Sequence, residues 1–257
     1  MQCWFILLPN DYLSLIISSF FTSLDAANFF FWDATGAYFS SAPDEMPLLH
    51  MWSVAVEERF YFIWSLIIFF SFKAFKGESL WLISIVLALV CFTISQHIAV
   101  TDAGYAYYMI HTRSGGLLLG AALSFMHRDY KRAREFNSSL TVLIGTLMIF
   151  WTSASLNANS IFPGINSAIP SLGAFLVIAG GSGFGNNFAS RIYSIKSIIW
   201  IGLISFSIYL WHWPLIAFAN YMGFWNQQKS KLRYLLRPSL WLYLASKSSK
   251  NPSENLS

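Results

Sequence analysis

A group of polar side chains lies in residues 50–59, where a loop enters a long apolar run. It holds one histidine, one serine, two glutamates and one arginine. A serine followed by acids in the first turn is typical of a helix start, so capping is one interpretation. Ionisable groups near hydrocarbon are costly and usually functional, so catalytic chemistry is the other. In a helix that begins at Ser53, Glu57 and Tyr61 share one face at the i, i+4 spacing, whereas Glu58 points about 100° away.

A second candidate is Arg113, the single ion in an otherwise apolar run from residue 104 to residue 126. A buried arginine requires an anionic or carbonyl partner. Arg113 either pairs with Glu57 or Glu58, or it binds an anionic group of a ligand. The sequence leaves both alternatives open.

The third candidate is His212, which stands between Trp211 and Trp213 and two residues before Pro214. Proline cannot donate the helical hydrogen bond to the carbonyl four residues earlier, so we expect a kink in this helix. A histidine flanked by tryptophans is typical of the aromatic belt at a membrane interface. The alternative is that His212 belongs to a functional site.

The composition excludes a water-soluble globular protein. The chain has 257 residues, of which 56% are hydrophobic and 11% are charged, whereas soluble domains carry about 25% charged residues. Residues 136–190 and 197–228 contain no Asp, Glu, Lys or Arg, and each stretch exceeds the roughly 20 residues that cross a bilayer. The net charge of +4 is not gathered in a basic patch, so we expect no nucleic-acid partner. Two cysteines and no metal-ligand spacing predict no metal site.

The apolar runs predict an all-α, polytopic membrane helix bundle. Backbone polar groups in lipid must be satisfied within the segment, which requires helices. We expect about seven transmembrane helices, at Tyr12–Phe31, Ser53–Phe75, Ser79–Ala99, Gly104–His127, Ser138–Leu156, Ala168–Gly181 and Ser197–Phe224.

The charges of the loops between these helices predict the orientation of the chain. Cations gather at residues 73–76, 127–134 and 191–196, and cationic loops mark the cytoplasmic side. The loops at 32–52 and near residues 100 and 160 then face the extracytoplasmic side. Glu57, Arg113 and His212 are therefore expected at similar depth in the outer half of the membrane, where they could share one site.

Three segments of the sequence resemble motifs of the membrane acyltransferase-3 family. The segment LLHMWSVAVEERFY at 48–61 is similar to the family's LLHTWSLSVEEQFY motif. TR at 112–113 with LLLGA at 117–121 resembles a family helix, and ISFSIYLWHWP at 204–214 resembles ISYSLYLWHWP. The resemblance covers about residues 8–224.

Members of this family O-acylate surface polysaccharides and related acceptors. The resemblance implies transfer of an acyl group, here acetyl, from a cytoplasmic acyl-CoA to a hydroxyl of an envelope glycan, in the bacterial inner membrane. The expected partners are membrane lipid, the acyl donor and the glycan acceptor, with no tightly bound cofactor. Such a reaction needs a base and groups that stabilise an oxyanion.

The predicted site combines residues from all three motifs. The candidate base is His212 or His50, Arg113 stabilises anionic charge, and Glu57 or Glu58 orients a histidine or the arginine. We expect motif neighbours to contact substrate, namely Trp52, Ser53, Tyr61, Tyr209 and Trp211.

Two departures from the family pattern leave further alternatives. Family members begin with a helix that carries an arginine and a histidine, and Met1–Asn10 does not match it. The family's closing helix is not recognisable in 229–257. We therefore expect a partial acyltransferase-3 domain at 1–228, followed by a polar, disordered or aberrant tail at 229–257. A catalytically inactive remnant is the first alternative function. A membrane transporter is less favoured, because the two halves show no inverted repeat.

Overall fold

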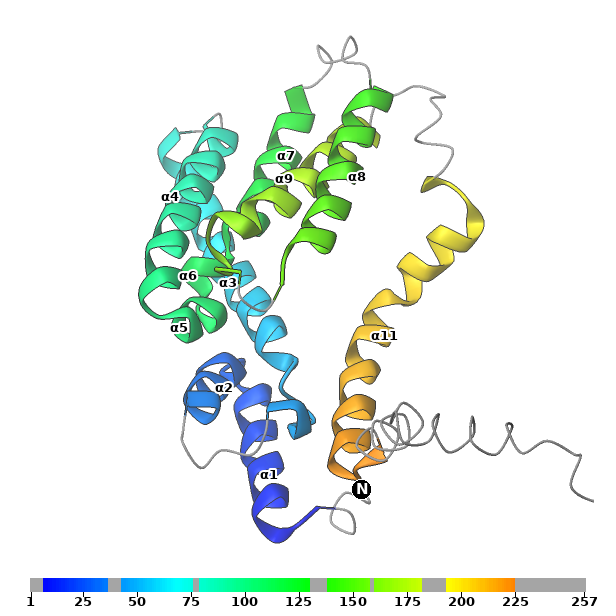
Figure 1. The fold of residues 1–257 in the computed structure, drawn as a ribbon. Coiled ribbons are helices and arrows are strands. Elements are labelled where there is room, and N and C mark those ends of the chain that lie inside the picture. The colour runs from blue at the N-terminus through cyan, green and yellow to red at the C-terminus, as the bar shows by residue number, and fades with distance from the viewer. Residues whose placement is uncertain are drawn as a thin grey trace, which may run out of the picture.

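The computed structural model describes residues 7–36, 43–75, 79–129, 138–157, 160–181 and 193–224. All regular structure in these ranges is helical, which confirms the all-α prediction, and Figure 1 shows the arrangement. The elements are α1 (Pro9–Ser23), α2 (Ala27–Gly36), the 3-10 turn η2 (Pro43–Glu45), α3 (Met51–Phe75), α4 (Leu80–Thr101), α5 (Ala103–Tyr108), α6 (Ile110–Arg113), α7 (Gly115–Asp129), α8 (Ser138–Ser155), α9 (Gly164–Gly181) and α11 (Lys196–Tyr221).

Three of the described helices are long and apolar enough to cross a membrane: α4, α9 and α11. Shorter apolar helices lie within α7 and α8. Many large apolar side chains are exposed, such as Leu203, which is 78% exposed. Lipid, rather than water, is the solvent that suits such a surface. The expected tail at 229–257 lies outside the described residues.

Two of the seven expected helices are divided in the structure. The run 12–31 forms α1 and α2, which meet at Asp25, whose φ is 53°. This left-handed conformation ends a helix. The run 104–127 forms α5, α6 and α7, because Met109 is extended, with φ −90° and ψ 145°. The Thr112 hydroxyl lies 2.6 Å from the Ala106 carbonyl oxygen and 2.7 Å from that of Met109, so it ties α6 to the end of α5 across the break.

Four helices, α4, α7, α8 and α9, pack against one another on one side of the molecule. The contact between α8 and α9 is closest where Gly145 faces Gly173. A Cβ added at Gly145 would lie 2.5 Å from the Gly173 carbonyl oxygen, and one added at Gly173 would lie 2.8 Å from the Gly145 oxygen. Glycine at both positions therefore allows the two backbones to touch, as is common between membrane helices.

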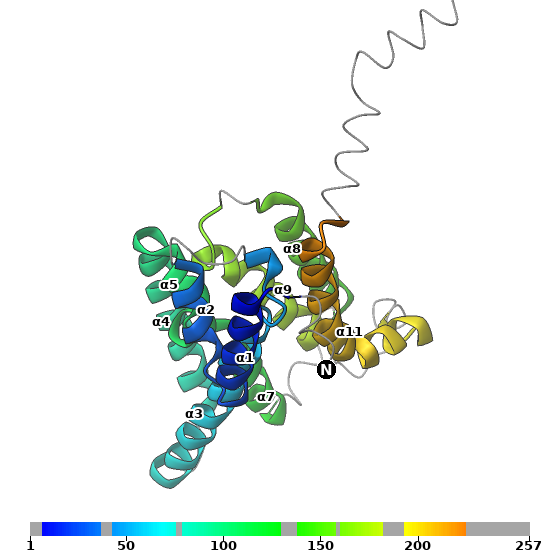
Figure 2. The ribbon, with the colours of Figure 1, turned by 90° about the horizontal axis from the view of Figure 1, so that it is seen from below.

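The segment before α3 is held between the N-terminal helices and α11. Its buried residue Met46 packs in one cluster with Trp52 of α3, Phe31 of α2 and Tyr108 of α5. α11 lies beside this segment and contacts η2 (Figures 1 and 2). The first and last predicted motifs are therefore brought together, although about 150 residues separate them in the chain.

Candidate functional site

The contact between α11 and the start of α3 is built on Tyr209. Its hydroxyl donates to the carbonyl oxygen of His50 at 2.5 Å. The Ser53 hydroxyl lies 2.6 Å from the same Tyr209 oxygen. Since a phenol has one proton to donate, the Ser53 hydroxyl is the donor in this second bond. Tyr209 and Ser53, both predicted to contact substrate, thus fix α11 against the first motif.

Three further hydrogen bonds tether α11 along its C-terminal half. The Trp213 indole nitrogen donates to the Met46 carbonyl at 2.9 Å, and the Asn220 amide nitrogen donates to the Asp44 carbonyl at 3.1 Å. The Tyr221 hydroxyl donates to a carboxylate oxygen of Asp11 at 2.9 Å. The first two bonds set the position of α11 along the segment 43–50, and the third joins its end to α1. Sequence reasoning missed this role of Trp213, since nothing in the local pattern distinguishes it from an interfacial tryptophan.

The two candidate bases, His50 and His212, lie side by side. Their ring centroids are 6.0 Å apart. Nδ1 of His212 lies 2.6 Å from the Tyr209 carbonyl oxygen and 3.2 Å from that of Ile208. A carbonyl oxygen can only accept, so Nδ1 carries the proton and Nε2 is unprotonated in the neutral ring. His212 is therefore arranged to take up a proton at Nε2.

His50 is buried, and its side chain is 7% exposed. Neither ring nitrogen makes a hydrogen bond of ordinary geometry to a described residue. Burial, together with the nearby His212, lowers the pKa of His50 from its ordinary value, and a contact with the backbone of Leu210 acts in the opposite direction. Burial therefore favours the neutral form of His50.

Arg113, at the end of α6, stands in a cage of aromatic rings. Its guanidinium carbon lies 4.8 Å from the ring centroid of Trp52, 5.0 Å from that of Tyr107 and 5.2 Å from that of Phe162. Within the described part of the chain, no carboxylate forms an ion pair with Arg113. The expected pairing with Glu57 or Glu58 is thus not formed in the structure, and cation–π contacts stabilise the charge instead.

A cavity of about 310 Å³ lies beside Arg113. Trp52, Ser53, Glu57 and Arg113 all line it, whereas neither histidine does. Ser53 bonds to Tyr209, whose ring centroid lies 5.3 Å from that of His50 and 5.6 Å from that of His212. An anion held in this cavity would face a positive charge that has no carboxylate partner within the described residues.

Of the ten predicted site residues, four line the cavity, His50, Tyr209 and His212 lie in the contact between α11 and the start of α3 without lining it, and three lie outside both. Glu58 is exposed, Tyr61 is 54% exposed and Trp211 is 69% exposed. None of these three lines the cavity. Conversely, the sequence carries no signal for the cage residues Tyr107 and Phe162, because the segments that hold them contain no motif.

We expect Ser53 and Tyr209 to be energetically coupled. Tyr209→Phe should lower the free energy of unfolding by about 1–3 kcal/mol, because it leaves the His50 carbonyl and the Ser53 hydroxyl without their partner. Ser53→Ala should cost less in the Tyr209→Phe background than alone. Thermal unfolding of both single variants and the double variant in detergent measures the coupling. Additive effects would contradict the hydrogen bond.

Comparison with known proteins relates the sequence of this chain to acyltransferases. A family model described as an acyltransferase domain matches residues 4–246. The chain is 31% identical over 217 residues to the peptidoglycan O-acetyltransferase OatA of Listeria monocytogenes, covering 79% of this chain and 34% of that protein. It is 27% identical over 183 residues to the O-acetyltransferase OatA of Staphylococcus aureus, covering 68% of this chain and 30% of that protein. The chain thus spans about a third of the length of these relatives. No solved structure matches it.

Proposed function

This chain belongs to the acyltransferase-3 family of membrane proteins, and from that membership we propose that it transfers an acetyl group from acetyl-CoA to a sugar hydroxyl of an envelope polysaccharide. Peptidoglycan is the proposed acceptor, because one of the two relatives is named as a peptidoglycan O-acetyltransferase. The proposed location is the bacterial inner membrane. The observation that carries the proposal is that Ser53 lines the same cavity as Glu57 and the cation of Arg113 and also bonds to Tyr209, which packs against two adjacent histidines.

In the proposed reaction, His212 is the general base. Its unprotonated Nε2 takes the proton of the acceptor hydroxyl, and the oxygen attacks the thioester carbonyl. Negative charge then develops on the carbonyl oxygen, and Arg113 stabilises it inside the cavity. The C–S bond breaks as the C–O ester bond forms, and the thiolate of coenzyme A leaves and takes up a proton. His50, buried and neutral, is the second group able to relay that proton.

In the part of the chain that the structure describes, Glu57 forms no ion pair with Arg113, but both side chains line the same cavity, and the proposed role of Glu57 is to orient that cation through its charge. We expect Glu57→Gln to lower the rate of acetyl transfer by about 10²-fold, because the amide keeps the size of the side chain but removes its charge. The assay uses the chain in membrane vesicles, with labelled acetyl-CoA and peptidoglycan fragments, and counts alkali-labile label on the glycan.

The matched control for Glu57→Gln is Asp33→Asn, which makes the same chemical change on an exposed residue of α2. This control should keep the activity of the unmodified chain. Unchanged transfer by Glu57→Gln would exclude the role of Glu57. A lack of transfer by the unmodified chain, with folded protein present, would contradict the proposed function itself.

A further inference from the structure

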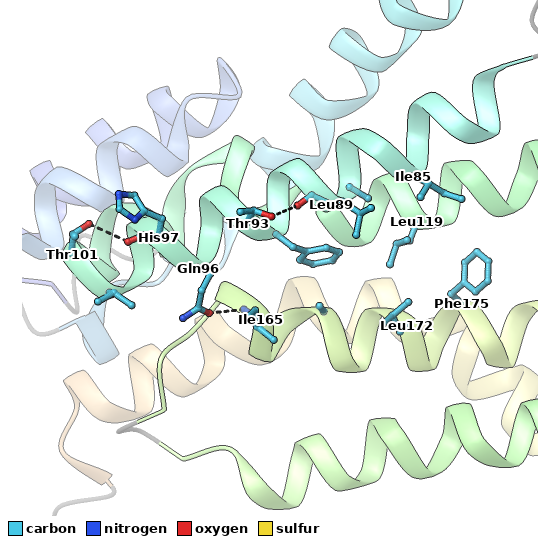
Figure 3. A pocket seen from close by; sticks show the side chains of 14 residues that line it. Ile85, Leu89, Thr93, Gln96, His97, Thr101, Leu119, Ile165, Leu172 and Phe175 are labelled. Carbon is cyan, nitrogen blue, oxygen red and sulfur yellow. Dashed lines mark hydrogen bonds between the residues drawn. The ribbon is translucent and has the colours of Figure 1, made fainter.

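A groove of about 890 Å³ lies along α4, and none of the predicted site residues lines it. Helices α4 and α9 form its two sides and Leu119 of α7 lies in its wall, as Figure 3 shows. Both α4 and α9 are long and apolar enough to cross a membrane. Two of the lining side chains are well exposed, Leu89 at 61% and Ile165 at 58%. The groove is therefore open along its side and faces the hydrocarbon of the bilayer.

The polarity of the groove changes from one end to the other. Ile85, Leu119 and Phe175 lie at one end, whereas Gln96 and Thr101 lie at the other (Figure 3). Between residues 85 and 101, α4 rises by about 24 Å, at about 1.5 Å per residue. One leaflet of the hydrocarbon core is about 15 Å thick. The groove is thus long enough for a chain that ends in a more polar group near the membrane surface.

The polar end carries hydrogen-bond donors but no strong positive charge. The Gln96 carboxamide oxygen accepts from the backbone N–H of Ile165 at 2.8 Å, which leaves the carboxamide nitrogen able to donate to another acceptor. Gly164 makes this contact possible, because a side chain there would collide with Gln96. No lysine or arginine is among the described residues that line the groove. Neutral ester carbonyls match this end better than a phosphate does.

We propose that the groove binds one acyl chain of a bilayer phospholipid, with its glycerol ester region at the Gln96 end. In the expected topology, the C-terminal end of α4 faces the extracytoplasmic side, so the lipid comes from the outer leaflet. This site is distinct from the proposed catalytic cavity and does not depend on the proposed function.

The two cavities share one wall, the side chain of Phe92. Its ring packs directly on the backbone of α7, where a Cβ added at Gly115 would lie 2.7 Å from the ring. An acyl chain in the groove therefore contacts the ring that closes the cavity of Arg113. The bound lipid would support that wall from the bilayer side.

The test compares two tryptophan substitutions at exposed leucines. Leu172→Trp fills the groove, since Leu172 lines it and is 42% exposed. Leu143→Trp is the matched control, since Leu143 of α8 is 53% exposed but lies outside the groove. Each chain is purified in detergent, washed extensively and examined by native mass spectrometry. We expect the unmodified chain and Leu143→Trp to retain one phospholipid, and Leu172→Trp to retain it at least about tenfold less, which corresponds to about 1.4 kcal/mol.

A second measurement on the unmodified chain keeps the proposal testable if Leu172→Trp does not fold. A phospholipid with a photoreactive diazirine in its acyl chain should label peptides from 85–101 and 165–175 more than those from α8. Three results would overturn the proposal: no phospholipid on the washed chain, equal retention by both tryptophan variants, or a polyprenyl phosphate as the retained lipid. Uniform labelling of all apolar helices would overturn it as well.

Discussion

Replacing His212 with asparagine is expected to lower the rate of acetyl transfer by about 10²–10⁴-fold, the range typical for loss of a general base. The amide nitrogen of the new side chain would stand where Nδ1 of the histidine stands, so it can still donate to the backbone carbonyls of Ile208 and Tyr209. What the variant lacks is Nε2, the nitrogen that is unprotonated in the neutral ring. The change therefore removes the proton acceptor while the local hydrogen bonds remain.

The control for this variant is His111→Asn, the same substitution at a half-buried histidine that packs against Tyr105. Initial rates with labelled acetyl-CoA and peptidoglycan fragments are compared at equal amounts of folded protein. Activity of His212→Asn near that of the control would exclude His212 as the base and would leave His50 as the candidate. A loss in both variants would point instead to a shared effect on folding.

The second large effect is expected at Arg113. Arg113→Met should lower kcat by about 10²–10³-fold, because it removes the positive charge that faces the developing oxyanion. The activity of Arg113→Lys should fall between those of Arg113→Met and the unmodified chain, since an ammonium keeps the charge but lacks the planar group that stacks on aromatic rings. The effect on stability should be much smaller, about 0.5–2 kcal/mol, because no carboxylate among the described residues loses its partner.

Arg59→Met is the matched control, because Arg59 is also helical and also stacked, at 4.4 Å from the Phe29 ring centroid. It donates to the backbone carbonyl of Asp25, however, and does not line the cavity. Its loss should lower the thermal midpoint without a comparable change in kcat. If Arg113→Met and Arg59→Met had the same ratio of activity loss to stability loss, Arg113 would be a structural residue only.

The class of the protein and the segments that carry its site could be predicted from the residues alone. Long uncharged runs allow only helices in a bilayer, because every backbone polar group there must be satisfied internally. The segments 48–61 and 204–214 were recognisable because their polar and aromatic residues are contiguous in the chain. The helix boundaries were harder to predict, because the breaks at Asp25 and Met109 occur within long apolar runs.

Which of these residues contact one another depends on how the helices pack, which is visible in the tertiary structure alone. The bond between Ser53 and Tyr209 joins positions 156 residues apart, and no local spacing encodes such a contact. The same holds for Arg113, whose cage combines rings from three separate segments: Trp52, Tyr107 and Phe162. The partner of a charge in a helix bundle depends on how each helix is rotated about its axis and which neighbour it packs against. Helix rotation and the choice of neighbour are set by the packing of the whole bundle, so the motifs alone do not specify them.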